Sequence, residues 1–157
     1  MQCGIACMVS VCRYYGVKYS ARFISGMGQI GHEGMSLLGL SKMAQRLGFR
    51  TMNVSIPLAK LYDLPLPCIL HWNQNHFVIL YRIDDHGRYH ICDPAKGILR
   101  LTEAEFLSHW ISASGKGIAM LLETTDKFGT IVEDHVTTPS VLRFVFGYIK
   151  EYKAYLF

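Results

Sequence analysis

The spacing of apolar residues changes at Gly48, and this change constrains the fold more than any other feature of the sequence. Before Gly48, apolar residues recur every three or four positions, which predicts helices over residues 3–15, 20–26 and 37–47. After Gly48, short apolar runs predict strands over residues 49–56, 68–72, 77–83, 88–93, 97–101 and 117–123, with helices at 57–61 and 102–110. This order predicts an α+β fold, in which N-terminal helices pack on a mostly antiparallel sheet.

Capping and turn residues mark the ends of several predicted elements. Ser36 is expected to cap the start of the third helix, and Gly48 to cap its end. Thr102 and Glu105 form a capping box before the last helix. The turn at residues 84–87 predicts a hairpin, and the last strand is expected to close the sheet.

Composition narrows the class of protein. A length of 157 residues, half of them hydrophobic and 18% charged, suits one folded domain. The net charge of +4 comes from scattered basic residues, so no nucleic-acid partner is indicated. The five cysteines are odd in number and form no metal-type pair, which predicts a reducing compartment without a metal site or disulfide scaffold. We find no signal peptide and no run of about 18 apolar residues.

The C-terminal part of the chain differs from the rest. We place a folded domain at residues 1–123 and a separate segment at 124–157. Residues 124–139 are largely polar and predict a linker, whereas residues 141–157 are apolar and aromatic, broken by lysine and arginine. The latter predict an interfacial helix or the lead-in to a transmembrane domain that is missing from this chain.

Cys3 is the first candidate for chemistry. It stands at the start of the first predicted helix, where the helix N-terminus favours a thiolate, and Gly4 allows close approach of another backbone. The alternative is that Cys3 is an ordinary buried cysteine beside an apolar helix. Cys7 and Cys12, inside the same helix, fit that description better.

His76 and Asp93 are the second and third candidates. His76 opens one predicted strand and Asp93 ends the next, so antiparallel pairing across the turn at 84–87 would bring them together. The alternatives are a surface-loop histidine and an aspartate that begins an Asp-Pro turn. His71 competes with His76 but lies within a hydrophobic strand, and His86 is expected to be solvated.

Together, Cys3, His76 and Asp93 supply a nucleophile, a base and a group that orients the base. The cysteine lies on the leading helix, and the other two residues lie on strands. This arrangement matches the plan of papain-like cysteine peptidases.

Several short motifs, taken in order, resemble one known family. They are Gln2-Cys3-Gly4-Ile5-Ala6-Cys7, Tyr14-Tyr15-Gly16, Glu33-Gly34-Met35-Ser36, Leu47-Gly48-Phe49, the run from Pro67 to Leu80, and Asp93-Pro94 with Gly97. This set, from Gln2 to Leu122, resembles the bacteriocin-processing peptidases. Those are the N-terminal domains of peptide-exporting ABC transporters that cut double-glycine leaders.

The resemblance implies roles for individual residues. Cys3 would be the nucleophile, His76 the general base and acid, and Asp93 the partner of His76. Cleavage would follow a Gly-Gly pair, through a narrow approach that admits only glycine. The leader would bind as an amphipathic helix in an apolar groove. Candidates for that groove, which are more often simply core residues, are Met35, Leu37, Leu38 and Leu40.

The resemblance also implies partners. They are a leader-bearing precursor peptide and, in an exporter, the membrane and nucleotide-binding domains of an ABC transporter. No cofactor is implied, because thiol acyl transfer needs none; ATP would act on a transporter module. Such a domain would lie at the cytoplasmic face of the bacterial inner membrane, or in the cytoplasm if free-standing.

One feature departs from the family pattern. The family's oxyanion-hole glutamine lies six residues before the cysteine, which falls before Met1, and Gln2 does not match that position. Either the native chain starts earlier, or the domain lacks this side-chain donor. The oxyanion donor therefore stays unknown from the sequence.

Three other functions fit parts of the pattern. The first is a non-catalytic, leader-binding domain of an exporter, which the presence of Cys3, His76 and Asp93 disfavours. The second is a cell-wall amidase or endopeptidase on the same fold, which the lack of an export signal disfavours. The third is a structural domain in which the three residues occur together by coincidence.

Overall fold

The computed structural model describes residues 3–27 and 35–133. Gln2, residues 33–34 and the predicted lead-in at 141–157 lie outside the described residues. Within the described residues, every helix and strand predicted from the sequence is present, and each end lies within one residue of its predicted place.

The first three helices precede the sheet in the chain. They are α1 (Cys3–Tyr14), α2 (Ala21–Ser25) and α3 (Leu37–Arg46), and the later helices are α4 (Leu58–Leu61) and α5 (Glu103–Trp110). No helix within the described ranges is both long enough and apolar enough to cross a membrane.

The predicted N-cap of α3 and the capping box of α5 are present, whereas the C-cap of α3 is Leu47, one residue before the predicted Gly48. The Ser36 hydroxyl accepts the N–H of Gly39 at 3.0 Å, as an N-cap does. Leu47 is the C-cap, and Gly48 follows it with a φ of 101°, the left-handed conformation that glycine adopts most readily. Thr102 and Glu105 form the capping box of α5.

Six antiparallel strands form one sheet in the order β1-β6-β2-β3-β4-β5. Their bounds are β1 (Phe49–Ile56), β2 (Cys68–Trp72), β3 (His76–Ile83), β4 (Tyr89–Asp93), β5 (Gly97–Leu101) and β6 (Gly117–Thr124). β6 does not lie at an edge of the sheet: it pairs with both β1 and β2. β6 thus completes the sheet as expected, but its place between two strands was not predicted, because hairpin signals cannot place a strand whose partners are distant in sequence.

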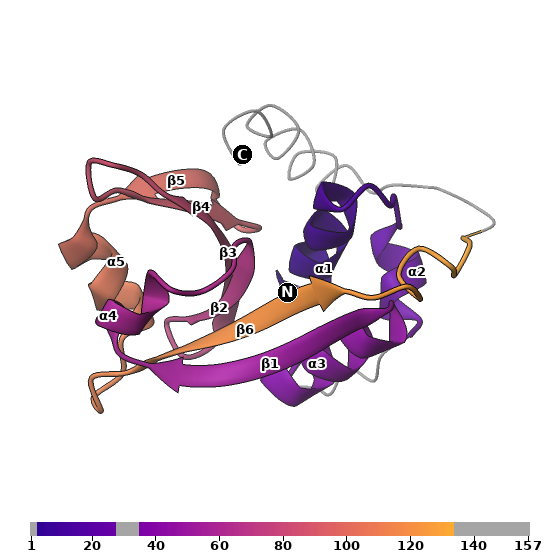
Figure 1. The fold of residues 1–157 in the computed structure, drawn as a ribbon, viewed down its shortest axis with the longest axis horizontal. Helices are drawn as coiled ribbons and strands as arrows, with labels where there is room; N and C mark the ends of the chain where they lie inside the picture. The colour runs from indigo at the N-terminus through magenta and orange to yellow at the C-terminus, as the bar shows by residue number, and fades with distance from the viewer. Residues whose placement is uncertain (1–2, 28–34, 134–157) are drawn as a thin grey trace.

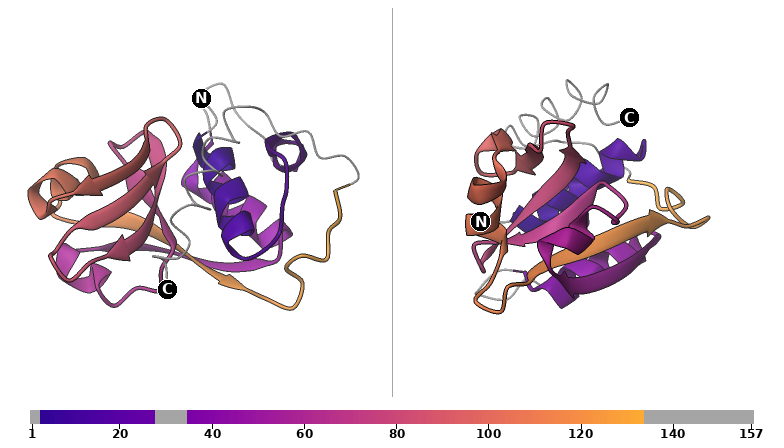
Figure 2. Two further views of the ribbon diagram at one scale, coloured as in Figure 1. Left: turned by 90° about the horizontal axis from the view of Figure 1, so that it is seen from above. Right: turned by 60° about the vertical axis from the view of Figure 1, so that its left-hand side comes forward.

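Two hydrophobic cores lie on opposite faces of the sheet. Side chains alternate along β3, so Phe77, Ile79 and Tyr81 join one core, whereas Val78 and Leu80 join the other. The first core packs against α1, α2 and α3, and the second packs against α5. In Figure 1, α1, α2 and α3 lie toward one end of the curved sheet, and α4 and α5 lie toward the other end; Figure 2 shows the same arrangement from two further directions.

Residues 125–133 return from β6 to the helices. Phe128 packs against Tyr15 and Phe49, at ring-centroid distances of 6.1 Å and 4.7 Å. The Glu133 carboxylate accepts the backbone N–H of Ser20 at 2.7 Å. This part of the predicted linker is therefore packed on the N-terminal helices, while the division of the chain at residue 123 stays a prediction.

Candidate active site

Cys3 is the first residue of α1 and is partly buried. A Cβ atom placed on its neighbour Gly4 would lie 3.4 Å from Leu40 and Met35 side-chain atoms and 3.5 Å from the Phe77 ring. These three side chains therefore surround the backbone beside the thiol. The nucleophile candidate thus lies at the junction of α1, the start of α3 and β3.

His76 and Asp93 lie in direct contact, as the hairpin argument predicted. His76 begins β3 and Asp93 ends β4, and Nε2 of His76 lies 2.7 Å from Oδ1 of Asp93. The register pairs Ile79 with Cys92, and one further step sets Asp93 opposite Val78. His76, two residues from Val78, is then a diagonal neighbour of Asp93 on the same face.

Hydrogen bonds hold the buried Asp93 in its ionised form. The residue is only 2% exposed, and its Oδ1 also accepts the backbone N–H of Ala95 at 2.8 Å. Burial raises the pKa of Asp93, but the hydrogen bonds from His76 and Ala95 outweigh it, so the pKa lies below its ordinary value. A buried carboxylate beside an imidazole fixes the ring's tautomer and stabilises its protonated form.

The hydrogen bond with Asp93, followed by one with Cys3, raises the pKa of His76 to about 9. Since Nε2 faces Asp93, Nδ1 is the ring nitrogen left for the thiol.

The Cys3 thiol is poised toward its ionised form. Burial raises its pKa, but the hydrogen bond with His76 and the backbone N–H groups of Phe77 and Gly4 lower it more, so the pKa lies below its ordinary value. By contrast, burial raises the pKa of every other cysteine, namely Cys7, Cys12, Cys68 and Cys92. Cys3 is therefore the cysteine whose surroundings favour a reactive thiolate.

The competing histidines lie elsewhere. His71 is partly buried in β2, where its ring packs on Phe77 at a centroid distance of 5.4 Å. Burial lowers the pKa of His71, which favours its neutral form. His86 is exposed in the hairpin turn, as expected.

The candidate groove residues divide into two groups. Leu38 is 62% exposed, and Met35 and Leu37 are partly buried. Leu40 is fully buried against the core, so its assignment as a contact residue was wrong: it has no surface to offer a ligand. The spacing of the leucines in α3 could not separate surface from core before α1 was placed.

Sequence reasoning missed two contacts near the site. The Cys7 thiol donates a hydrogen bond to the backbone carbonyl of Phe77 at 3.4 Å, and His90 pairs with Asp84 at 2.8 Å. The second pair flanks a hairpin turn and could have been anticipated from that spacing. The first depends on the packing of α1 on β3, which no local signal indicates. No group of three potential metal ligands occurs among the described side chains.

Several known proteins with similar sequences are named as secretion/processing or transport/processing ATP-binding proteins. The colicin V secretion/processing ATP-binding protein CvaB of Escherichia coli is 29% identical over 93% of this chain and 20% of its own length. The transport/processing ATP-binding protein ComA of Streptococcus pneumoniae is 29% identical over 70% of the chain and 16% of its own length. The chain thus spans about a fifth, or less, of these relatives.

Solved structures with the same fold are peptidase domains. A double-glycine-motif protease from an AMS/PCAT transporter, in complex with the leader peptide, has a TM-score of 0.71 and 28% identity; the match covers 79% of this chain and 85% of that one. The peptidase domain of Streptococcus ComA has a TM-score of 0.68 and 26% identity, over 79% and 92% of the two chains. These likenesses confirm the α+β, papain-like fold. Residues 1–127 match the peptidase C39 family, which supports a cysteine peptidase, and the chain belongs to that family.

Proposed function

We propose that this domain is a cysteine endopeptidase that cleaves leader peptides after a Gly-Gly pair, coupled to peptide export. The observation that carries the proposal is the buried Asp93–His76 pair, whose second ring nitrogen is left for a thiol of lowered pKa at a helix N-terminus. A histidine that is oriented by a carboxylate and faces a thiol is the arrangement that thiol acyl transfer requires.

The proposed reaction begins with the Cys3 thiolate and the His76 imidazolium. The thiolate attacks the carbonyl carbon of the second glycine, and backbone N–H groups in the first turn of α1 stabilise the oxyanion. His76 then gives its proton to the leaving amine, which leaves a thioester on Cys3. Water attacks the thioester as His76 takes its proton, and the leader's new carboxyl terminus and the thiolate are released.

The surroundings of Cys3 support selection of glycine. Met35, which is partly buried, packs beside the backbone of Gly4 next to the nucleophile, so a substrate without side chains at the scissile pair meets the fewest clashes. The exposed Leu38, with Met35 and Leu37, offers an apolar edge at the start of α3 to a leader helix.

The partners in this proposal are a leader-bearing precursor peptide and the membrane and nucleotide-binding domains of an ABC transporter. Relatives named as secretion/processing or transport/processing ATP-binding proteins support this assignment. The peptidase step itself would use no cofactor, and ATP would act on the transporter module. The domain would then work at the cytoplasmic face of the inner membrane.

The test is incubation with a synthetic peptide that carries a double-glycine leader, followed by mass spectrometry, with Cys3→Ala as control. We expect cleavage after the Gly-Gly pair by the wild-type protein and none by the variant. Leader binding by both proteins without cleavage would instead identify a docking domain. Cleavage by Cys3→Ala would overturn the proposal.

A further inference from the structure

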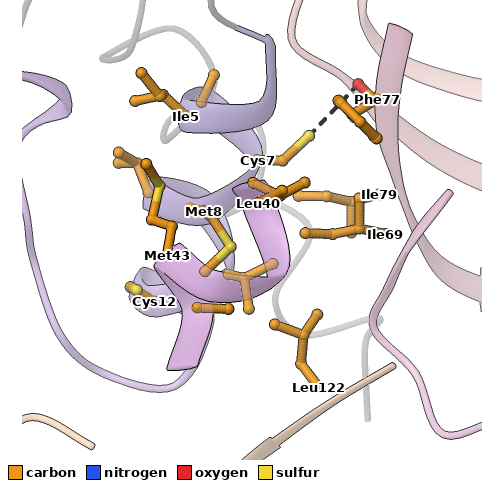
Figure 3. Close-up of a cluster of buried hydrophobic side chains, with 14 of the residues drawn as sticks. Ile5, Cys7, Met8, Cys12, Leu40, Met43, Ile69, Phe77, Ile79 and Leu122 are labelled. Atoms are coloured by element: carbon orange, nitrogen blue, oxygen red, sulfur yellow. Dashed lines mark hydrogen bonds between the residues drawn. The ribbon is translucent and has the colours of Figure 1, made fainter. Parts of the chain in front are cut away.

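A second cysteine lies one helical turn from the nucleophile and faces the strand that carries His76. Cys7 is fully buried in α1, and its Sγ donates to the carbonyl oxygen of Phe77 at 3.4 Å. Figure 3 shows this contact crossing from α1 to β3 within the hydrophobic core. Burial raises the pKa of Cys7 well above its ordinary value, so the thiol keeps its proton and acts as a donor.

The same strand residue also contacts the nucleophile. The backbone N–H of Phe77 is hydrogen-bonded to the Cys3 thiol and lowers its pKa. Phe77 is therefore held at its carbonyl group by Cys7, while its N–H group helps to lower the pKa of Cys3. Because His76 directly precedes Phe77, these contacts fix the position of the histidine relative to α1.

We propose that Cys7 is a positioning residue, whose thiol holds Phe77 so that its N–H stays on Cys3 and His76 stays within reach of the nucleophile. The inference rests on the proposed peptidase function and adds a residue that does not touch the substrate. Loss of the Cys7 donor frees the Phe77 carbonyl to shift, which weakens the N–H contact that stabilises the Cys3 thiolate.

The test compares Cys7→Ala, Cys7→Ser and Cys12→Ala. Cys12 is also buried in α1 but lies roughly 13 Å along the helix from Cys3, so Cys12→Ala removes the same atom far from the site. Two quantities are measured: the pH dependence of Cys3 alkylation by iodoacetamide, and kcat and KM for a double-glycine leader peptide.

We expect Cys7→Ala to raise the apparent pKa of Cys3 and to lower kcat about three- to tenfold, the size of one hydrogen bond, with KM unchanged. Cys7→Ser, whose hydroxyl can donate to the same carbonyl, should recover much of both effects. Cys12→Ala should match the wild-type protein. Cys7→Val, which fills the site without a donor, replaces Cys7→Ala if the latter does not fold.

The inference is overturned if the donor-free Cys7 variant keeps the wild-type pKa of Cys3, or if Cys7→Ser is as impaired as that variant. Alkylation needs no leader peptide. Failure of the wild-type protein to cleave leaders would therefore reject the peptidase proposal, while the Cys3 profile would still decide the role of Cys7.

Discussion

The β3–β4 hairpin carries a histidine–aspartate pair at each end, and the two pairs have nearly the same geometry. His76 and Asp93 are 2.7 Å apart at the open end, and His90 and Asp84 are 2.8 Å apart near the turn. Both imidazoles are 16% exposed, and both carboxylates are largely buried. The contact between the two side chains therefore does not distinguish a candidate catalytic pair from a structural one.

The surroundings of the two pairs do distinguish them. His76 is also hydrogen-bonded to the Cys3 thiol, which helps to raise its pKa to about 9. Asp84 instead accepts the backbone N–H groups of His86 and Arg88 and lies 3.6 Å from Arg100. One carboxylate thus contacts a histidine that also contacts a thiol, whereas the other accepts the backbone N–H groups of a turn.

The largest expected effect on leader cleavage is that of removing the Cys3 thiol. Cys3→Ala should lower the rate of leader cleavage at least about a thousandfold, because no other group can form the thioester. Cleavage is measured by mass spectrometry of the products. His90→Ala, which removes the other imidazole, is the matched control and should leave the rate unchanged; equal losses in the two variants would contradict the assignment.

The two aspartates should differ next. Asp93→Ala should lower kcat/KM on the order of a hundred- to ten-thousandfold, because His76 loses its orienting carboxylate. Asp84→Ala should have the wild-type value, since its partner His90 lies near the turn, away from Cys3. Both variants are measured by steady-state kinetics. A larger loss of kcat/KM in Asp84→Ala than in Asp93→Ala would contradict the distinction between the two pairs.

A smaller effect is expected on the alkaline side of the pH profile of kcat/KM. The pKa of His76 is raised to about 9, so its proton should be retained below that value and lost above it. Wild-type kcat/KM should therefore fall as the pH rises through about 9. In Asp93→Ala the fall should occur at lower pH, because Asp93 is the main cause of the raised pKa; an unchanged limb would contradict this reading.

The smallest expected effect concerns stability at the turn. Asp84→Ala removes the acceptor for two backbone N–H groups and should lower Tm by about 3–6 °C, measured by circular dichroism. Asp84→Asn keeps a side-chain oxygen for those groups and should lower Tm less. A larger loss in Asp84→Asn would show that charge, rather than the turn hydrogen bonds, holds this end of the hairpin.

Local signals predicted most of the fold. Ser36, Gly48 and the Thr102–Glu105 box mark helix ends through contacts within a few residues, so the sequence predicts them well. The same holds for the hairpin that joins His76 to Asp93, because its pairing depends on one short turn. The catalytic roles of these residues stay predictions.

Features that depend on distant contacts were not predictable. β6 enters the sheet between β1 and β2, a pairing between strands about 60 residues apart. Leu40 looked like a groove residue until α1 was placed against it. The hydrogen bond from Cys7 to Phe77 forms only when α1 packs against β3, and the two residues are 70 positions apart in the sequence.

The most direct test of the central claim is to find which of the five cysteines reacts first. The protein is treated with one equivalent of iodoacetamide at roughly pH 6, where ordinary thiols are protonated, and is then mapped by peptide mass spectrometry. We predict that the label lies on Cys3 alone, that leader cleavage falls in proportion, and that His76→Ala abolishes this selective labelling. Label spread over several cysteines, or a labelled Cys3 in a fully active protein, would contradict the account.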